Sequence, residues 1–162
     1  MGLTTPALLV SALVSVGVVA SPRIAAAQFP PDGPGRETFE SVCGLCHAPA
    51  AVAGKLWTRP QWEAKVAEML QEEPEVTFEE RATIVEYLSS HFKPGGKIYI
   101  NVVGAKDLAT ALQLSTENAD AIVRYREEKG RYSAADDLKK IPGLDITKIA
   151  AAKDRLEFSK AR

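Results

Sequence analysis

Two cysteines and a histidine lie together in the segment Cys43-Gly44-Leu45-Cys46-His47. Two thiols three positions apart can each add to a vinyl group on one edge of a porphyrin, and the imidazole of the next residue can then ligate the iron. The spacing therefore predicts one covalently attached haem c. Cys43 and Cys46 would hold the porphyrin, and His47 would be the proximal iron ligand.

A Cys-x-x-Cys pair also occurs as a structural disulfide, as half of a zinc site or as a thioredoxin-like redox pair. A zinc site takes about four N or S ligands, and besides this segment the chain offers only the distant His91 among cysteines and histidines. The βαβ pattern that accompanies a thioredoxin-like pair is missing. Because His47 directly follows the second cysteine, we favour haem attachment.

A second axial ligand must come from elsewhere in the chain. Met69 is the only methionine besides Met1, and a thioether is the usual partner of histidine in electron carriers because it raises the reduction potential. His91, at the end of an expected helix, is the competing candidate, and an open sixth position is the third alternative. A methionine on an apolar helix face is also ordinary core. We expect Met69 to ligate the iron.

Three helices are expected between residues 36 and 93. Phe39 lies four residues before Cys43 and so shares a helix face with it. Thr58 with Gln61, and Thr77 with Glu80, have the spacing of capping boxes that begin two further helices. Three short helices bury a very small core, so we expect an apolar haem to supply its centre. Helical spacing places these residues on the buried faces: Trp62, Val66, Met69, Leu70, Ile84, Val85, Leu88 and Phe92.

The N-terminal residues have the pattern of an export signal. Residues 7–20 are uncharged, too few to span a bilayer comfortably, which takes about 20 apolar residues. The alanines at 25–27 fit a small-x-small cleavage site, so residues 1–27 are predicted to be a signal peptide, although residues 1–6 contain no Lys or Arg. The alternative is an uncleaved anchor. Export and haem attachment together predict a periplasmic protein.

Composition predicts a soluble globular protein, yet charge divides the chain in two. Residues 28–96 contain 6 Lys/Arg and 11 Asp/Glu, a net of −5, whereas residues 97–162 contain 13 and 10, a net of +3. This asymmetry predicts two modules with different surfaces. The Pro/Gly-rich residues 28–35 are predicted to be a flexible leader, and residues 94–97 a linker.

The first module resembles a known family. Residues 36–92, with the Cys-x-x-Cys-His motif, resemble a class I cytochrome c domain. Within that class they resemble the small haem domains that accept electrons beside periplasmic quinoprotein or molybdenum dehydrogenases. The resemblance implies that Met69 binds iron, and that the protein is an electron carrier without substrate chemistry. Its partners would be such a dehydrogenase and a downstream cytochrome or oxidase. The motifs concerned are Trp62-x-x-x-Val66-x-x-Met69 and Glu80-x-x-x-Ile84-x-x-Tyr87-Leu88.

The second module, residues 98–158, follows a different pattern. A short extended segment precedes four expected helices at residues 106–112, 117–129, 134–139 and 146–156. The sequence resembles the tandem helix-hairpin-helix domain of the ComEA DNA-uptake receptors, and equally the extrinsic U subunit of photosystem II, which docks onto proteins with this fold. The resemblance is in Ile98-Tyr99-Ile100-Asn101, Ala121-Ile122-Val123-x-Tyr125-Arg126 and Asp137-Leu138-x-x-Ile141-Pro142-Gly143-Leu144.

Charge and turn residues favour protein docking over DNA binding. A DNA-binding hairpin brings backbone N–H groups to a phosphate through a glycine-rich turn. The first turn, residues 112–115, has no glycine, and the second keeps Gly143 but has Asp145 in place of another. A net charge of +3 is small for a protein that must contact several phosphates. A basic surface nevertheless keeps DNA open as an alternative: Lys139, Lys140, Lys148 and Lys153.

The sequence thus predicts an all-α protein with a small class I cytochrome c domain followed by a tandem helix-hairpin-helix domain. Its predicted function is that of a periplasmic monohaem cytochrome c that transfers single electrons, with a tail for protein docking. The alternatives are a ComEA-like DNA-binding protein that carries a haem, and a haem enzyme or gas sensor with an open sixth position.

Overall fold

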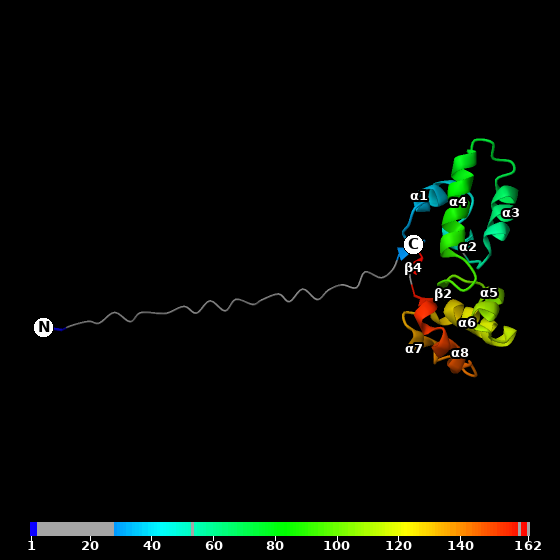
Figure 1. The fold of residues 1–162 in the computed structure, drawn as a ribbon. Coiled ribbons are helices and arrows are strands. Elements are labelled where there is room, and N and C mark those ends of the chain that lie inside the picture. Colours follow the sequence, from blue (N-terminus) through cyan, green and yellow to red (C-terminus); the bar gives the residue numbers. More distant parts are fainter. Residues whose placement is uncertain (3–27, 53, 159, 162) are drawn as a thin grey trace.

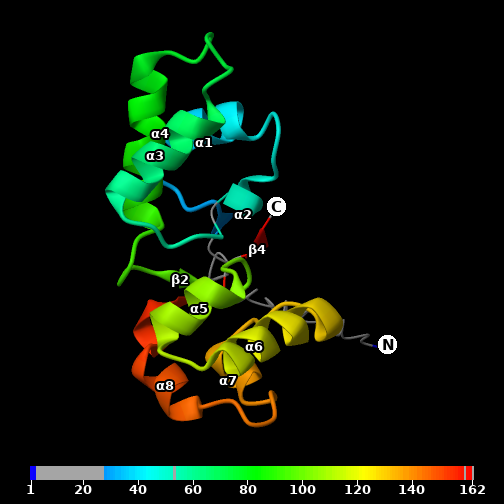
Figure 2. The same ribbon diagram turned by 90° about the vertical axis from the view of Figure 1, so that its right-hand side faces the viewer.

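A computed structural model describes residues 1–2, 28–52, 54–158 and 160–161. The predicted signal peptide lies almost wholly outside the described residues and stays a prediction. The protein is all-α, as the sequence predicted, and its helices form two groups, one above the other in both ribbon views (Figures 1 and 2). The first group holds α1 (Arg36–Cys43), α2 (Pro49–Val52), α3 (Arg59–Met69) and α4 (Phe78–His91).

The first group is built on α4, against which both α1 and α3 pack. Both expected capping boxes form: the Thr58 N–H donates to Gln61 at 2.9 Å, and the Thr77 N–H donates to Glu80 at 2.8 Å. The ring of Phe39 stacks on Tyr87 with 5.2 Å between ring centroids. The predicted apolar stripes are confirmed except at Met69, which is 38% exposed because it lies at the C-terminal end of α3. The described core includes Trp62, Val66, Leu70, Ile84, Val85, Leu88 and Phe92.

The second group contains α5 (Ala105–Leu112), α6 (Thr116–Lys129), α7 (Ala135–Leu138) and α8 (Ile146–Ala151). The prediction of a helix through residue 156 is wrong: α8 ends at Ala151 and is followed by the 3₁₀ turn η1 (Lys153–Arg155). Strand β3 (Leu156–Glu157) then pairs in parallel with β2 (Ile98–Tyr99). Residues 156–157 therefore form a strand and not the end of a helix. This pairing joins the two ends of the module and buries Leu156.

The two groups share a continuous apolar core. The Phe92 ring lies 5.4 Å from Tyr99, and the Phe29 ring lies 5.4 Å from Tyr99 and 5.9 Å from Phe92, measured between centroids. The prediction of a flexible leader is therefore wrong at Phe29, which is 1% exposed. Its aromatic side chain fills the junction between the modules. Strand β1 (Gln28–Phe29) pairs in parallel with β4 (Lys160–Ala161).

Polar contacts also join the groups. The Leu56 N–H donates to the Asp107 carboxylate at 3.3 Å, and the Gly104 N–H donates to the Gly54 carbonyl at 3.2 Å. The Lys55 ammonium lies 3.7 Å from the Asp107 carboxylate. Short connections and shared contacts thus hold the second module directly against the first. Within the described part of the chain, no helix combines the length and apolarity that a membrane crossing requires.

Candidate functional site

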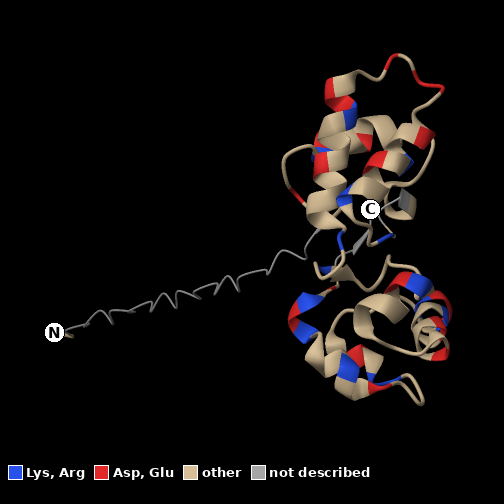
Figure 3. Ribbon diagram, turned by 45° about the vertical axis from the view of Figure 1, so that its right-hand side comes forward, with Lys and Arg blue, Asp and Glu red and all other residues tan. Residues whose placement is uncertain are grey.

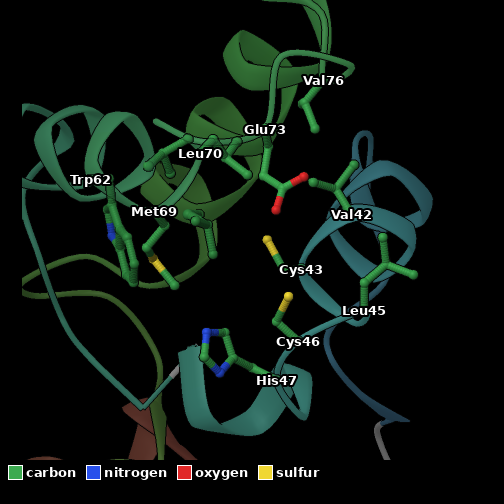
Figure 4. Close-up of a pocket in the computed structure, with 12 residues that line it drawn as sticks. Val42, Cys43, Leu45, Cys46, His47, Trp62, Met69, Leu70, Glu73 and Val76 are labelled. Atoms are coloured by element: carbon green, nitrogen blue, oxygen red, sulfur yellow. The ribbon is translucent and has the colours of Figure 1, made fainter.

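A pocket of about 240 Å³ opens between the end of α1, the following turn, α3 and α4. Its walls are mainly apolar, and Figure 4 shows side chains from separate elements turned toward one space. The Cys-x-x-Cys-His segment forms one wall. The lining residues are Val42, Cys43, Leu45, Cys46, His47, Trp62, Val66, Met69, Leu70, Glu73, Val76 and Leu88.

The Cys-x-x-Cys-His segment reaches the pocket because α1 ends inside it. Cys43 is the last residue of α1, and the Gly44 N–H donates to the Glu40 carbonyl at 3.0 Å. A Cβ at position 44 would collide with that carbonyl oxygen, so glycine is required by this close approach. The His47 N–H donates to the Cys43 carbonyl at 3.2 Å. The resulting turn directs Cys43, Cys46 and His47 to the same side (Figure 4).

The two thiols lie in different surroundings. Cys43 is partly buried, and burial, reinforced by the nearby Cys46, raises the pKa of the Cys43 thiol to about 11. Cys46 is exposed, and both cysteines are free thiols. A thioredoxin-like pair requires a thiolate with a lowered pKa, so the environment of Cys43 argues against that interpretation.

The structure separates the two candidates for the second iron ligand. Met69, the last residue of α3, lines the pocket and points toward the space that His47 also faces (Figure 4). His91 is not among the lining residues. Its ring lies 4.8 Å from that of Tyr87, and burial, together with Lys93, lowers its pKa. Only Met69 of the two shares a pocket with the cysteines.

The described residues contain no group of three or more His, Cys, Asp or Glu side chains that could hold a metal ion by themselves. A haem needs fewer ligands from the protein, because the porphyrin supplies the equatorial ligands and the protein supplies only the axial ones. His47 and Met69 are a donor pair of that kind. The pocket's apolar walls suit the porphyrin, so the residues present fit a haem.

Arg81 is a structural residue of the site that the sequence analysis missed. Its guanidinium donates to three carbonyls of the segment between α3 and α4, those of Leu70 at 2.7 Å, Glu73 at 2.6 Å and Val76 at 3.0 Å. All three of these residues line the pocket. An arginine in the first turn of a helix gives no periodic signal, so the sequence alone did not point to this role.

Trp62 forms the back of the pocket and connects it to the second module. The indole is 1% exposed and donates its N–H to the Phe92 carbonyl at 2.8 Å. Phe92 in turn packs on Tyr99 of β2. The pocket wall and the junction between the modules are therefore one packed structure.

In both hairpin turns of the second module, a side chain accepts hydrogen bonds from the backbone N–H groups at the start of the next helix. Ser115 accepts from the Asn118 N–H at 3.2 Å at the start of α6. At the start of α8, the Asp145 carboxylate accepts from the N–H groups of Thr147 at 3.1 Å and Lys148 at 3.4 Å. These are the donors that a phosphate would use. The structure therefore supplies a carboxylate where a DNA-binding turn leaves the N–H groups free.

Asn118 joins the two hairpins, a role the sequence analysis did not identify. Its side-chain oxygen accepts from the Asp145 N–H at 2.9 Å, and its side-chain nitrogen donates to the Gly143 carbonyl at 3.4 Å. Gly143 adopts a φ of +74°, a conformation that favours glycine. The second turn is thus held by α6 in one conformation.

The lysines considered as a DNA-binding surface are mostly paired within the module. Ion pairs join Lys139 to Asp136 at 2.6 Å and Lys140 to Asp137 at 2.7 Å. Lys148 lies 3.9 Å from Asp145 and also donates to the Gln113 carbonyl. This pairing reduces the charge offered to a polyanion, because three of the four lysines already face a carboxylate.

Comparison with known families supports the prediction of a helix-hairpin-helix fold for the second module. Residues 93–157 match the family model described as helix-hairpin-helix motif, which confirms that part of the resemblance. No solved structure matched the chain. The match covers the second module, and the haem-domain resemblance of the first stays a prediction.

Proposed function

We propose that residues 36–93 carry one covalently bound haem c and transfer single electrons, and that residues 98–158 dock this carrier onto a protein partner. One observation carries the proposal: Cys43, Cys46, His47 and Met69 line the same apolar pocket although they come from two separate segments. The donor types fit a haem with histidine and thioether axial ligands.

Each residue has a distinct task in this proposal. Cys43 and Cys46 would form the two thioether bonds to the porphyrin, and His47 and Met69 would be the axial ligands. The haem would supply a one-electron couple between ferrous and ferric iron. The soft thioether of Met69 favours the reduced state, and the buried Trp62 keeps water from the pocket wall.

The cellular setting is part of the same proposal. An exported protein with a c-type haem would work in a periplasm, receive electrons from a quinoprotein or molybdenum dehydrogenase, and pass them to a cytochrome or oxidase. With both axial positions filled by side chains, no iron position would remain for a substrate. The protein would then be a carrier rather than an enzyme.

A redox titration of the haem-loaded protein tests this role. We expect a reversible one-electron transition, and no prompt spectral change when carbon monoxide is added to the reduced protein, because Met69 would leave the iron no open position. A rapid carbon monoxide complex under native conditions would instead favour the enzyme or gas-sensor alternative. The haemless variant Cys43→Ala/Cys46→Ala provides the spectral baseline.

The docking role of the tail is tested by a binding isotherm on duplex DNA, begun at low ionic strength and repeated at increasing salt. We expect little binding even at low salt, because Asp145 occupies the helix N-terminus and Lys139, Lys140 and Lys148 are paired. Binding that persists near physiological salt, with a steep salt dependence, would make the protein a DNA receptor that carries a haem.

A further inference from the structure

The negative charge of the first module is concentrated in one segment. Residues 68–81 contain six Glu and one Arg, a net of −5. The remainder of residues 28–96 contains five acidic and five basic residues, a net of zero. The whole net charge of the module therefore lies on the end of α3, the connection to α4 and the first turn of α4, the top of the molecule in Figure 3.

This acidic segment borders the pocket. Glu73 is a lining residue, and Figure 4 shows its carboxylate turned toward the side of the pocket formed by Val42 and Cys43. Arg81 holds the segment in place through its three carbonyl contacts. Among the described residues, no ion pair involves Glu72, Glu73 or Glu75, whereas Glu68 pairs with Lys65 at 2.7 Å.

The pocket mouth beside these carboxylates is apolar and exposed. Leu45, between the two cysteines, lines the pocket and is 84% exposed. An apolar centre bordered by unpaired carboxylates is the layout of a surface for transient association, in which charge directs the encounter and apolar contact completes it.

We infer that the pocket mouth, defined as Leu45 and the acidic residues 72, 73 and 75, is the docking surface for the redox partner, and that this partner presents an apolar edge within a rim of Lys and Arg. The inference rests on the proposed function, because the partner must approach the haem. Opposite charges at this rim would speed association and align the two redox centres.

The test uses the full-length, haem-loaded protein and a lysine-rich mitochondrial cytochrome c as the probe of a basic rim. Amide shifts of the isotope-labelled protein should change around residues 45–47 and 68–76. The variant Glu72→Gln/Glu73→Gln/Glu75→Gln should weaken binding by about tenfold at low ionic strength, and salt should weaken the wild type in the same way.

A matched control removes the same charge from the other module. The variant Glu117→Gln/Glu127→Gln/Glu128→Gln changes three exposed carboxylates of α6, and we expect its affinity for the probe to stay within about twofold of the wild type because screening weakens distant charges. Equal loss in both variants, or shifts confined to α5–α8, would overturn the inference while the haem and its redox couple stay intact. Absence of covalent haem would instead overturn the proposed function.

Discussion

At the scale of single residues, Met69 and His91 are distinguished by their neighbours. Met69 borders the pocket with both cysteines, whereas His91 packs beside Tyr87 near the leader. Sequence spacing left this choice open, because both residues lie near the end of an expected helix. Of the two, the structure places only Met69 in the pocket that the cysteines line.

Replacing Met69 tests that placement. In Met69→Ala the haem should remain attached through Cys43 and Cys46, but the reduction potential should fall by on the order of 0.1 V because the thioether ligand is lost. The sulfur-to-iron charge-transfer band should disappear. His91→Ala is the control and should leave both the potential and the band unchanged. An unchanged potential in Met69→Ala, or a lowered one in His91→Ala, would contradict the assignment.

At the scale of elements, the connection between α3 and α4 depends on Arg81. Arg81→Ala should lower the free energy of unfolding by about 1–3 kcal/mol, because three backbone carbonyls lose a charged donor. Arg59→Ala is the matched control and should have a much smaller effect: Arg59 forms exposed ion pairs with Glu63 and Glu86, and solvent screening leaves such pairs with little effect on stability. Denaturant unfolding measures both, and equal effects would contradict the role given to Arg81.

The start of α7 gives a pH-dependent prediction. Hydrogen bonds from the Lys140 side chain and from the N–H groups of Ser133 and Ala134 lower the pKa of Asp137 to about 2. Because the folded pKa lies below the unfolded value of 3.8, Asp137 contributes stability that is full above about pH 4 and is lost as the pH falls toward 2.

Thermal unfolding of the wild type and Asp137→Asn across pH 2–7 measures this contribution. The variant should unfold at a lower temperature at neutral pH, and the difference should shrink as the pH falls from 4 to 2, because the wild-type carboxylate then becomes neutral. A difference that stays constant over that range would show that charge at position 137 is not responsible.

At the scale of the whole molecule, the two modules form one packed structure. Phe29, Phe92 and Tyr99 meet at the junction, and Asp107 accepts from the first module. We therefore expect a single cooperative unfolding transition, with matching calorimetric and van't Hoff enthalpies. Two resolved transitions, one lost on deletion of residues 97–162, would show that the modules are independent.

The sequence predicted what depends on local spacing. The capping boxes at Thr58 and Thr77 each join residues three positions apart, so the printed order of residues was sufficient. The apolar stripe around Trp62 followed from helical periodicity.

Contacts between distant residues could not be predicted in this way. The burial of Phe29, the pairing of Leu156 with Ile98 and the links from Asn118 to the second turn depend on how the modules pack. Residues 28–35 are rich in Pro and Gly, which predicted a flexible leader. The ring of Phe29 within this segment is nevertheless buried against Phe92 and Tyr99. Tertiary packing also replaced the end of the last expected helix with a strand.

Covalent haem attachment is the central claim, and the mass of the denatured protein tests it most directly. After export from a host with c-type haem maturation, the wild type should carry the mass of one haem that denaturation does not remove, and Cys43→Ala/Cys46→Ala should not. The pyridine haemochrome of the wild type should have the spectrum of a haem with both vinyl groups saturated. A wild type exported intact from the same host but without this added mass would contradict the account.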